Sequence, residues 1–195
     1  MSKLQSGQAS RVVIILAVVV LIMAALVYGI TRYALSKKAA ATPAASGPVP
    51  AVYDTSIGDV KFSFDSAKNF GTVLSGKASR FPAYQPDITT TEKFIKIVVK
   101  AQNTGKTDTT QYGWDLGNLI DAEGRIFPPI NDKAYSWLPF PDLCGSVLKP
   151  GFEPTVCIRY YEVAKVSTSL KLEVIAPKPN STKMQKQLMD INITK

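Results

Sequence analysis

The two cysteines of the chain have a spacing that suits a disulfide bond. Twelve residues separate Cys144 from Cys157, and they include the turn-forming sequence Leu-Lys-Pro-Gly at residues 148–151. Such a turn can bring the two Cα atoms within the roughly 4.4–6.8 Å that a disulfide requires. We therefore predict that the cysteines are bonded to each other. The alternative is two separate buried thiols, because free cysteine packs as a small apolar side chain.

An aromatic segment, residues 135–141, precedes the first cysteine. Its seven residues include Tyr135, Trp137 and Phe140 together with two prolines. Aromatic rings on a rigid loop can stack on sugars or on proline-rich peptides with little loss of side-chain entropy. We therefore predict a ligand-contact loop here, with a protein or a cell-wall glycan as the ligand. The alternative is that Trp137 and Phe140 close the open end of the domain over its own core.

No set of residues in the sequence matches a known arrangement for catalysis or for binding metals. The chain contains no histidine, which excludes Ser-His-Asp and Cys-His chemistry, histidine-ligated metals and imidazole pH switching. Two thiolates alone would leave a tetrahedral metal site half built. The carboxylates of Asp121, Glu123, Asp132 and Asp142 form no spaced pair whose surroundings would raise one pKa. We expect a protein without enzymatic activity, metal or cofactor.

The elements that carry these residues are predicted to be short strands. Apolar and polar residues alternate with period two in successive segments, each bounded by Gly, Pro, Asn or Asp. No long helical pattern follows residue 35. About seven strands without intervening helices predict an all-β fold, an antiparallel β-sandwich. The expected strand segments are 60–65, 93–102, 116–120, 125–127, 154–163, 169–175 and 187–194.

The alternation also predicts which side chains face the core. In the segment 187–194 the inward set is Met189, Ile191 and Ile193. Residues 121–124 are expected to form a hairpin turn, with Gly124 at the position that needs a positive φ. In the segment 93–102 the inward set is Ile95, Ile97, Val99 and Ala101.

Four pieces of sequence in this order carry a family resemblance. They are the strand that ends in Asn103-Thr104-Gly105, the D-x-x-G-x-x-aromatic hairpin at 121–127, the turn at 148–151 and the strand at 170–172. Residues 54–194 thereby resemble immunoglobulin-like β-sandwich domains of unassigned function in secreted, lipid-anchored and membrane-anchored bacterial proteins. This family is related in fold to a mycobacterial secreted immunogenic protein. The resemblance implies a fold and a location but no shared activity.

A long apolar segment near the start of the chain predicts a membrane anchor. Residues 12–30 contain no charge and no proline. At about 1.5 Å per residue they can cross the roughly 30 Å hydrocarbon core of a bilayer. A cleaved signal peptide is the alternative, although its apolar region is usually about 7–15 residues long. The expected plan is a tail (1–11), a transmembrane helix in the lipid bilayer acting as signal anchor (12–35), an Ala/Pro-rich linker (36–53) and the sandwich (54–195).

Charge and orientation complete the prediction from sequence. Five of the eight net positive charges lie within residues 1–51, so the remainder has no basic stripe for nucleic acid. The basic residues beside the apolar segment slightly favour a cytoplasmic C-terminal domain. A large domain is often translocated regardless, and a disulfide forms in oxidising compartments. We therefore expect a single-pass protein of the cell membrane with an extracytoplasmic binding domain. The alternative function is an accessory or structural subunit of a membrane or cell-envelope complex.

Overall fold

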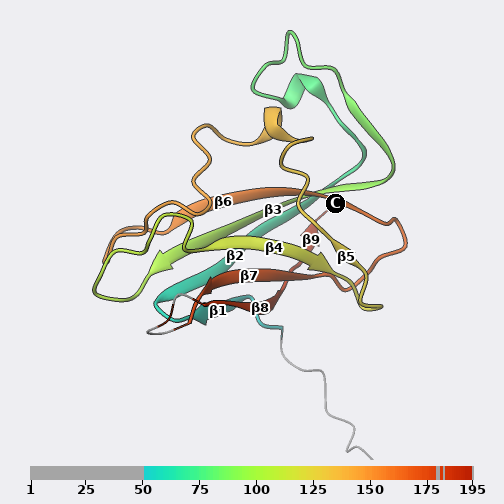
Figure 1. Cartoon of the computed structure of the whole chain (residues 1–195). Helices are drawn as coiled ribbons and strands as arrows, with labels where there is room; N and C mark the ends of the chain where they lie inside the picture. Colours follow the sequence, from blue (N-terminus) through green and yellow to red (C-terminus); the bar gives the residue numbers. More distant parts are fainter. Residues whose placement is uncertain (1–50, 179–180, 182, 195) are drawn as a thin grey trace, which may run out of the picture. The chain divides into compact units, whose positions relative to one another are not determined.

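Two β-sheets make up the part of the chain that the computed structural model describes, residues 51–178, 181 and 183–194 (Figure 1). The first sheet has the order β1 (Asp54–Ile57), β2 (Val60–Leu74), β3 (Ile88–Asn103) and β6 (Thr155–Val163), and β9 (Ile193–Thr194) also pairs with β2. The second has the order β5 (Ile126–Phe127), β4 (Asp115–Ile120), β7 (Lys171–Pro177) and β8 (Met184–Asp190). All these pairings are antiparallel except that of β2 with β9.

The described chain is therefore all-β, as the alternation predicts. Its helical content is two single-turn 3-10 helices, η1 (Gly76–Ala78) and η2 (Tyr135–Trp137). Gly124 has a φ of +80° in the turn between β4 and β5, which agrees with the expected hairpin. No helix within the described residues is long and apolar enough to span a bilayer. The predicted tail and transmembrane helix, and most of the linker, lie outside the described residues.

The main core lies between the two sheets. Because successive side chains of a strand point to opposite faces, alternate residues of β3 enter it together. The four predicted inward residues of β3 are fully buried there. They join buried residues of the second sheet such as Leu172 and Val174, and the rings of Phe62 and Trp114 meet edge to face at 6.2 Å. The sandwich is thus closed by side chains from both sheets.

A second apolar cluster lies on the outer face of the first sheet. It includes Phe94 and Tyr160, whose neighbours along their strands point into the main core. The long connection between β5 and β6 covers this face with Ala134, Trp137 and Leu138 (Figure 1). Ile130 donates its backbone N–H to the carbonyl oxygen of Tyr160 at 2.8 Å, so the connection is also fastened to the edge strand β6. The central strands therefore bury both faces at this place.

Three features of the strands differ from the sequence prediction. The segment β1 was not expected, and β2 and β3 are longer than expected. Their hairpin ends in a projection, residues 75–87, which we call the arm (Figure 1). The expected single strand 187–194 is wrong, because the chain leaves the second sheet after β8 and β9 joins the first. Asp190 marks this change, since its N–H donates to Val52 O at 2.8 Å; Met189 is fully buried, whereas Ile191 and Ile193 are partly buried.

Candidate ligand-binding surface

The arm folds back on itself because of one glycine. Gly76 is buried, and a Cβ atom at this position would lie 1.8 Å from the carbonyl oxygen of Gln85. Its N–H donates to the Asp87 carboxylate at 2.7 Å, and the Ser75 hydroxyl donates to the same oxygen at 3.3 Å. Only glycine allows the two sides of the arm to approach so closely.

The aromatic segment at 135–141 lies against this arm, and its three rings have different environments. Trp137 is 9% exposed and donates its indole N–H to the carbonyl oxygen of Ser75 at 2.9 Å. It packs into the second apolar cluster, on the outer face of the first sheet. Tyr135 and Phe140 remain 55% and 76% exposed. The structure thus separates the predicted contact residues into one buried anchor and two exposed rings.

Arg80 of the arm joins the two exposed rings to a third ring, Phe81. The distances from its guanidinium carbon to the ring centroids of Phe81, Tyr135 and Phe140 are 5.1, 4.8 and 5.5 Å. Its backbone N–H donates to Ser136 O at 2.7 Å, and Nη2 donates to Tyr135 O at 3.0 Å. We call Arg80 and these three rings the aromatic patch. Nothing in the local sequence around Arg80 indicates this role, because the rings of Tyr135 and Phe140 lie on a different connection.

A disulfide three residues after the aromatic segment fastens the same connection to β6. Cys144 and Cys157 are bonded, with their Cα atoms 4.8 Å apart, and the predicted pairing is confirmed. The Asp142 carboxylate accepts a hydrogen bond from the Cys144 N–H at 3.1 Å and another from Arg159 at 2.8 Å. The segment that bears Tyr135 and Phe140 is therefore held both by the arm and by β6.

The buried guanidinium group of Arg159 pairs with two partly exposed carboxylates beside the disulfide. Its guanidinium group contacts Asp142 of the connection at 2.8 Å and Asp115 of β4 at 2.9 Å, so it links the two sheets. A ligand oxygen of Asp115 and the two sulfurs lie within 4.8 Å of one another. Because these sulfurs are bonded to each other, they offer no thiolate to a metal ion. We interpret the cluster as a structural fastening.

Asp121 is the most strongly held carboxylate of the β4–β5 hairpin. It accepts hydrogen bonds from the Ser167 hydroxyl at 2.6 Å, from Arg125 Nε at 2.5 Å, and from the backbone N–H groups of Glu123 and Arg125. Burial opposes ionisation, but the hydrogen bonds from Ser167 and Arg125 outweigh it and lower the pKa of Asp121 from 3.8 to about 2. Its side chain thus has a clear structural role in the turn.

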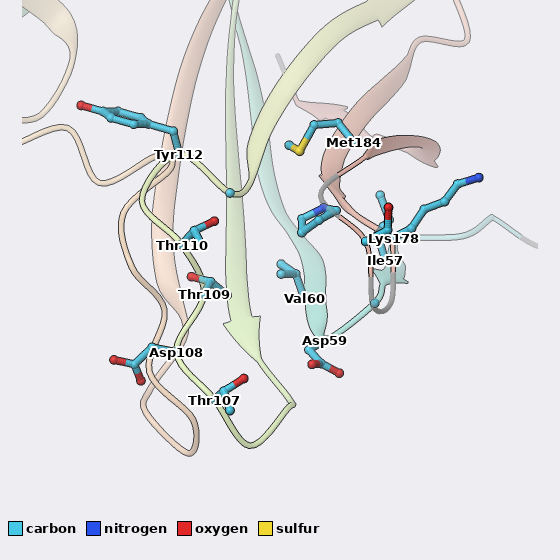
Figure 2. Close-up of a pocket in the computed structure, with 14 residues that line it drawn as sticks. Ile57, Asp59, Val60, Thr107, Asp108, Thr109, Thr110, Tyr112, Lys178 and Met184 are labelled. Carbon is cyan, nitrogen blue, oxygen red and sulfur yellow. The ribbon is translucent and has the colours of Figure 1, made fainter.

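A cavity of about 430 Å³ lies at the other end of the long β2–β3 hairpin from the arm (Figure 2). The β1–β2 turn, residues 107–113 and the end of β7 line it. The side chains of Tyr112 and Lys178 point away from it in Figure 2, and Thr109 Oγ1 already accepts a hydrogen bond from the Leu148 N–H at 2.8 Å. No residue chosen from the sequence lines this cavity. The threonines at 107, 109 and 110 are the signal that could have indicated it.

Asn103, the last residue of β3, positions the lining of this cavity. Its side-chain amide donates to Thr107 O at 2.7 Å and to Leu148 O at 2.9 Å, and its oxygen accepts the Gly105 N–H at 2.8 Å. A buried amide with three partners holds two loops in fixed positions. The asparagine at the end of this strand therefore has a structural role.

The chain was compared with protein families, with curated proteins and with solved structures. No family model matches the chain, and no curated protein is detectably similar to it. A conserved hypothetical protein from Bacillus anthracis has a similar solved structure, with a TM-score of 0.46, 14% identity, and coverage of 73% of this chain and 94% of that one. A functionally unknown protein from Listeria monocytogenes EGD-e has a TM-score of 0.44, 8% identity, and coverage of 73% and 82%. Neither likeness bears on the function of the chain.

Proposed function

We propose that this chain is a membrane-anchored, extracytoplasmic binding module that holds its ligand on the aromatic patch and carries out no catalysis. The observation that carries the proposal is the set of exposed rings gathered around Arg80. Large rings exposed together on one surface are uncommon in a domain that has no partner. They bring much contact area for little entropy, since each ring has only two rotatable side-chain bonds.

The fastening of the patch supports a role in binding. Hydrogen bonds from Arg80 and Trp137 connect the arm to the aromatic segment, and the disulfide that follows the segment connects the same loop to β6. A ligand that meets a surface already in its bound shape loses less free energy to ordering. Such preorganisation is useful to a binding site and is unnecessary in a simple spacer domain.

The chain enters the sandwich at the β1 edge of the first sheet. Val52 is fastened at the β1 edge, where its N–H donates to the Asp190 carboxylate at 2.7 Å. The aromatic segment covers the outer face near the opposite edge, at β6 (Figure 1). The expected Ala/Pro-rich linker over 36–53 would reach roughly 55 Å if extended. We propose that it carries an immunoglobulin-like sandwich clear of the lipid.

Substitution of the exposed rings tests the proposal. The full chain in lipid nanodiscs is titrated with soluble glycan fragments released from cell walls. Replacing Tyr135 and Phe140 together by alanine should weaken binding about thirtyfold, that is by about 2 kcal/mol, as expected for central aromatic contacts.

The control is Phe152→Ala, which removes another exposed ring. Phe152 is 60% exposed and lies 5.5 Å from the Lys149 ammonium group, so it matches the ring-and-cation arrangement outside the patch. Its removal should leave binding unchanged. Equal losses in the two variants, or none in the double variant, would contradict the proposal. Capture of membrane proteins by both variants without glycan binding would favour the accessory-subunit alternative.

A further inference from the structure

The three arginines within residues 51–178 have unequal partners. Arg125 and Arg159 each pair with two carboxylates, at N–O distances of 2.5–2.9 Å. Arg80 pairs with no carboxylate among the residues that the structure describes. The positive charge at the centre of the aromatic patch is therefore not neutralised by the described part of the domain itself.

The hydrogen-bond donors of Arg80 show which side is open. Nη2 donates to the carbonyl oxygen of Tyr135 at 3.0 Å. Nε is buried and has no hydrogen-bond partner, and the rings around the guanidinium group replace such a partner. Nη1 is not fully buried, and it donates no hydrogen bond to any residue that the structure describes. Its two N–H groups thus remain available to a ligand.

The chemistry of this arrangement specifies a class of ligand. A guanidinium group is weakly hydrated and presents a planar set of donors that matches a carboxylate. The ring faces beside it can take the C–H face of a sugar. We propose that the aromatic patch binds an acidic glycan, with Arg80 contacting the carboxylate of a uronic acid unit and the rings contacting its pyranose face. This inference rests on the proposed binding function and adds the charge and class of the ligand.

The exposure of the three rings favours a glycan over a peptide. The cavities of about 430 and 180 Å³ are lined by other residues, so the rings of the patch stand outside them. Peptides are usually held in grooves or along sheet edges, where their backbone finds hydrogen-bond partners. The nearby edge strand β6 is already occupied at Tyr160 by Ile130. A sugar chain that crosses the rings needs neither a groove nor a strand edge.

A matched pair of probes tests the inference on the full chain in nanodiscs. One probe is an oligogalacturonide, and the other is the same oligomer with its carboxylates methyl-esterified. The acid should bind at least about tenfold more tightly than the ester, because a charged hydrogen-bonded contact is lost on esterification. Arg80→Gln should remove this preference. Arg80→Lys, which keeps the charge but not the planar donor set, should reduce it.

The control variant is Lys77→Gln, which removes an exposed cation of the same arm and should keep the preference. A second measurement needs no substitution. Raising the salt concentration from about 50 mM to about 500 mM should weaken binding of the acid and leave the ester unaffected, because salt screens charge pairs. This result supports the inference even if Arg80→Gln disturbs the arm.

The outcomes separate this inference from the proposed function. Equal binding of acid and ester, with both lost in the Tyr135 and Phe140 double variant, would overturn the acidic-glycan inference and leave the binding module intact. Absence of binding by the acid, or a preference that persists in Arg80→Gln, would overturn it as well. A tighter complex with a phosphate-bearing glycan of equal length would transfer the role of Arg80 to phosphate and reject the uronic acid.

Discussion

Asp121 illustrates how a single carboxylate can stabilise a turn. Four hydrogen bonds reach its carboxylate, and two of them come from side chains of the hairpin and of the β6–β7 connection. Its own N–H donates to Arg125 O at 3.2 Å, and Gly124 follows at a positive φ. The D-x-x-G spacing therefore has a physical basis: the aspartate satisfies the donors of the turn, and the glycine allows its backbone geometry.

This network predicts an acid-dependent loss of stability. The pKa of Asp121 is about 2 in the folded chain, against an ordinary value of 3.8. The folded state is therefore more stable when this carboxylate is ionised. The contribution of Asp121 to stability is therefore complete above about pH 4 and is lost as the pH falls through about 2. Urea unfolding measured between pH 5 and pH 2 should show a smaller decline in Asp121→Asn than in the unsubstituted chain.

Other carboxylates also have a lowered pKa in the fold, among them Asp65, Glu162 and Asp190. The unsubstituted chain should consequently lose stability in acid through several groups. The difference between it and Asp121→Asn isolates one of them. Asp108→Asn, at an exposed loop carboxylate, serves as the control and should follow the unsubstituted chain. Identical pH profiles for all three proteins would refute the role assigned to Asp121.

At the scale of elements, the arm and the aromatic segment depend on each other. The arm supplies Arg80 and the carbonyl oxygen of Ser75, and the segment supplies the rings of Tyr135 and Trp137. Apart from the single-turn helices η1 and η2, neither contains regular secondary structure. Their order comes from contacts between residues 55 to 62 positions apart in the sequence.

Gly76→Ala tests this dependence. The added Cβ would meet Gln85 O at 1.8 Å, and because that atom is backbone, the arm must open. We expect the loss of glycan binding and rapid proteolytic cleavage within residues 75–87, while the disulfide-bonded sandwich resists digestion. Limited proteolysis followed by mass spectrometry, together with the nanodisc titration, measures both effects.

Gly124→Ala provides the control for this variant. Gly124 has a positive φ, which Gly76 does not, but a Cβ at Gly124 would meet nothing within 4 Å. It should lower the stability of the hairpin by about 1 kcal/mol and leave ligand binding unchanged. If Gly76→Ala keeps full affinity, the arm does not position the patch.

The strands and the aromatic patch show how much of the structure could be predicted from the sequence. The part of β3 over 93–102 was readily predicted, because its alternate residues from Ile95 to Ala101 are buried and alternation is the pattern of such a strand. The strand β1 gives no such pattern, since only Ile57 of its four residues is buried. The patch could be half predicted: Tyr135 and Phe140 stand out by type, whereas Arg80 is distant in sequence. Periodicity reports local burial and carries no information about contacts between loops.

At the scale of the whole molecule, the predicted anchor and the patch require one orientation. If the ligand is a cell-wall glycan, residues 54–195 must lie outside the cytoplasmic membrane. The disulfide between Cys144 and Cys157 agrees, since such bonds persist in oxidising compartments. The opposing observation is the charge beside the apolar segment. Lys3 and Arg11 precede it, and a slightly larger set follows it at 32, 37 and 38.

Protease added to intact cells that express the full chain decides between these two orientations, with spheroplasts used where an outer membrane is present. We expect cleavage in the proline-rich linker over 36–53 and release of a disulfide-bonded fragment that begins near residue 54. An N-terminal tag should stay with the membrane, which a cleaved signal peptide would not allow. A cytoplasmic marker protein must remain intact in the same cells.

Protection of the sandwich until the cells are lysed would place it inside, as the flanking charges indicate. A glycan of the cell wall could then not reach the aromatic patch, because the membrane would separate the two.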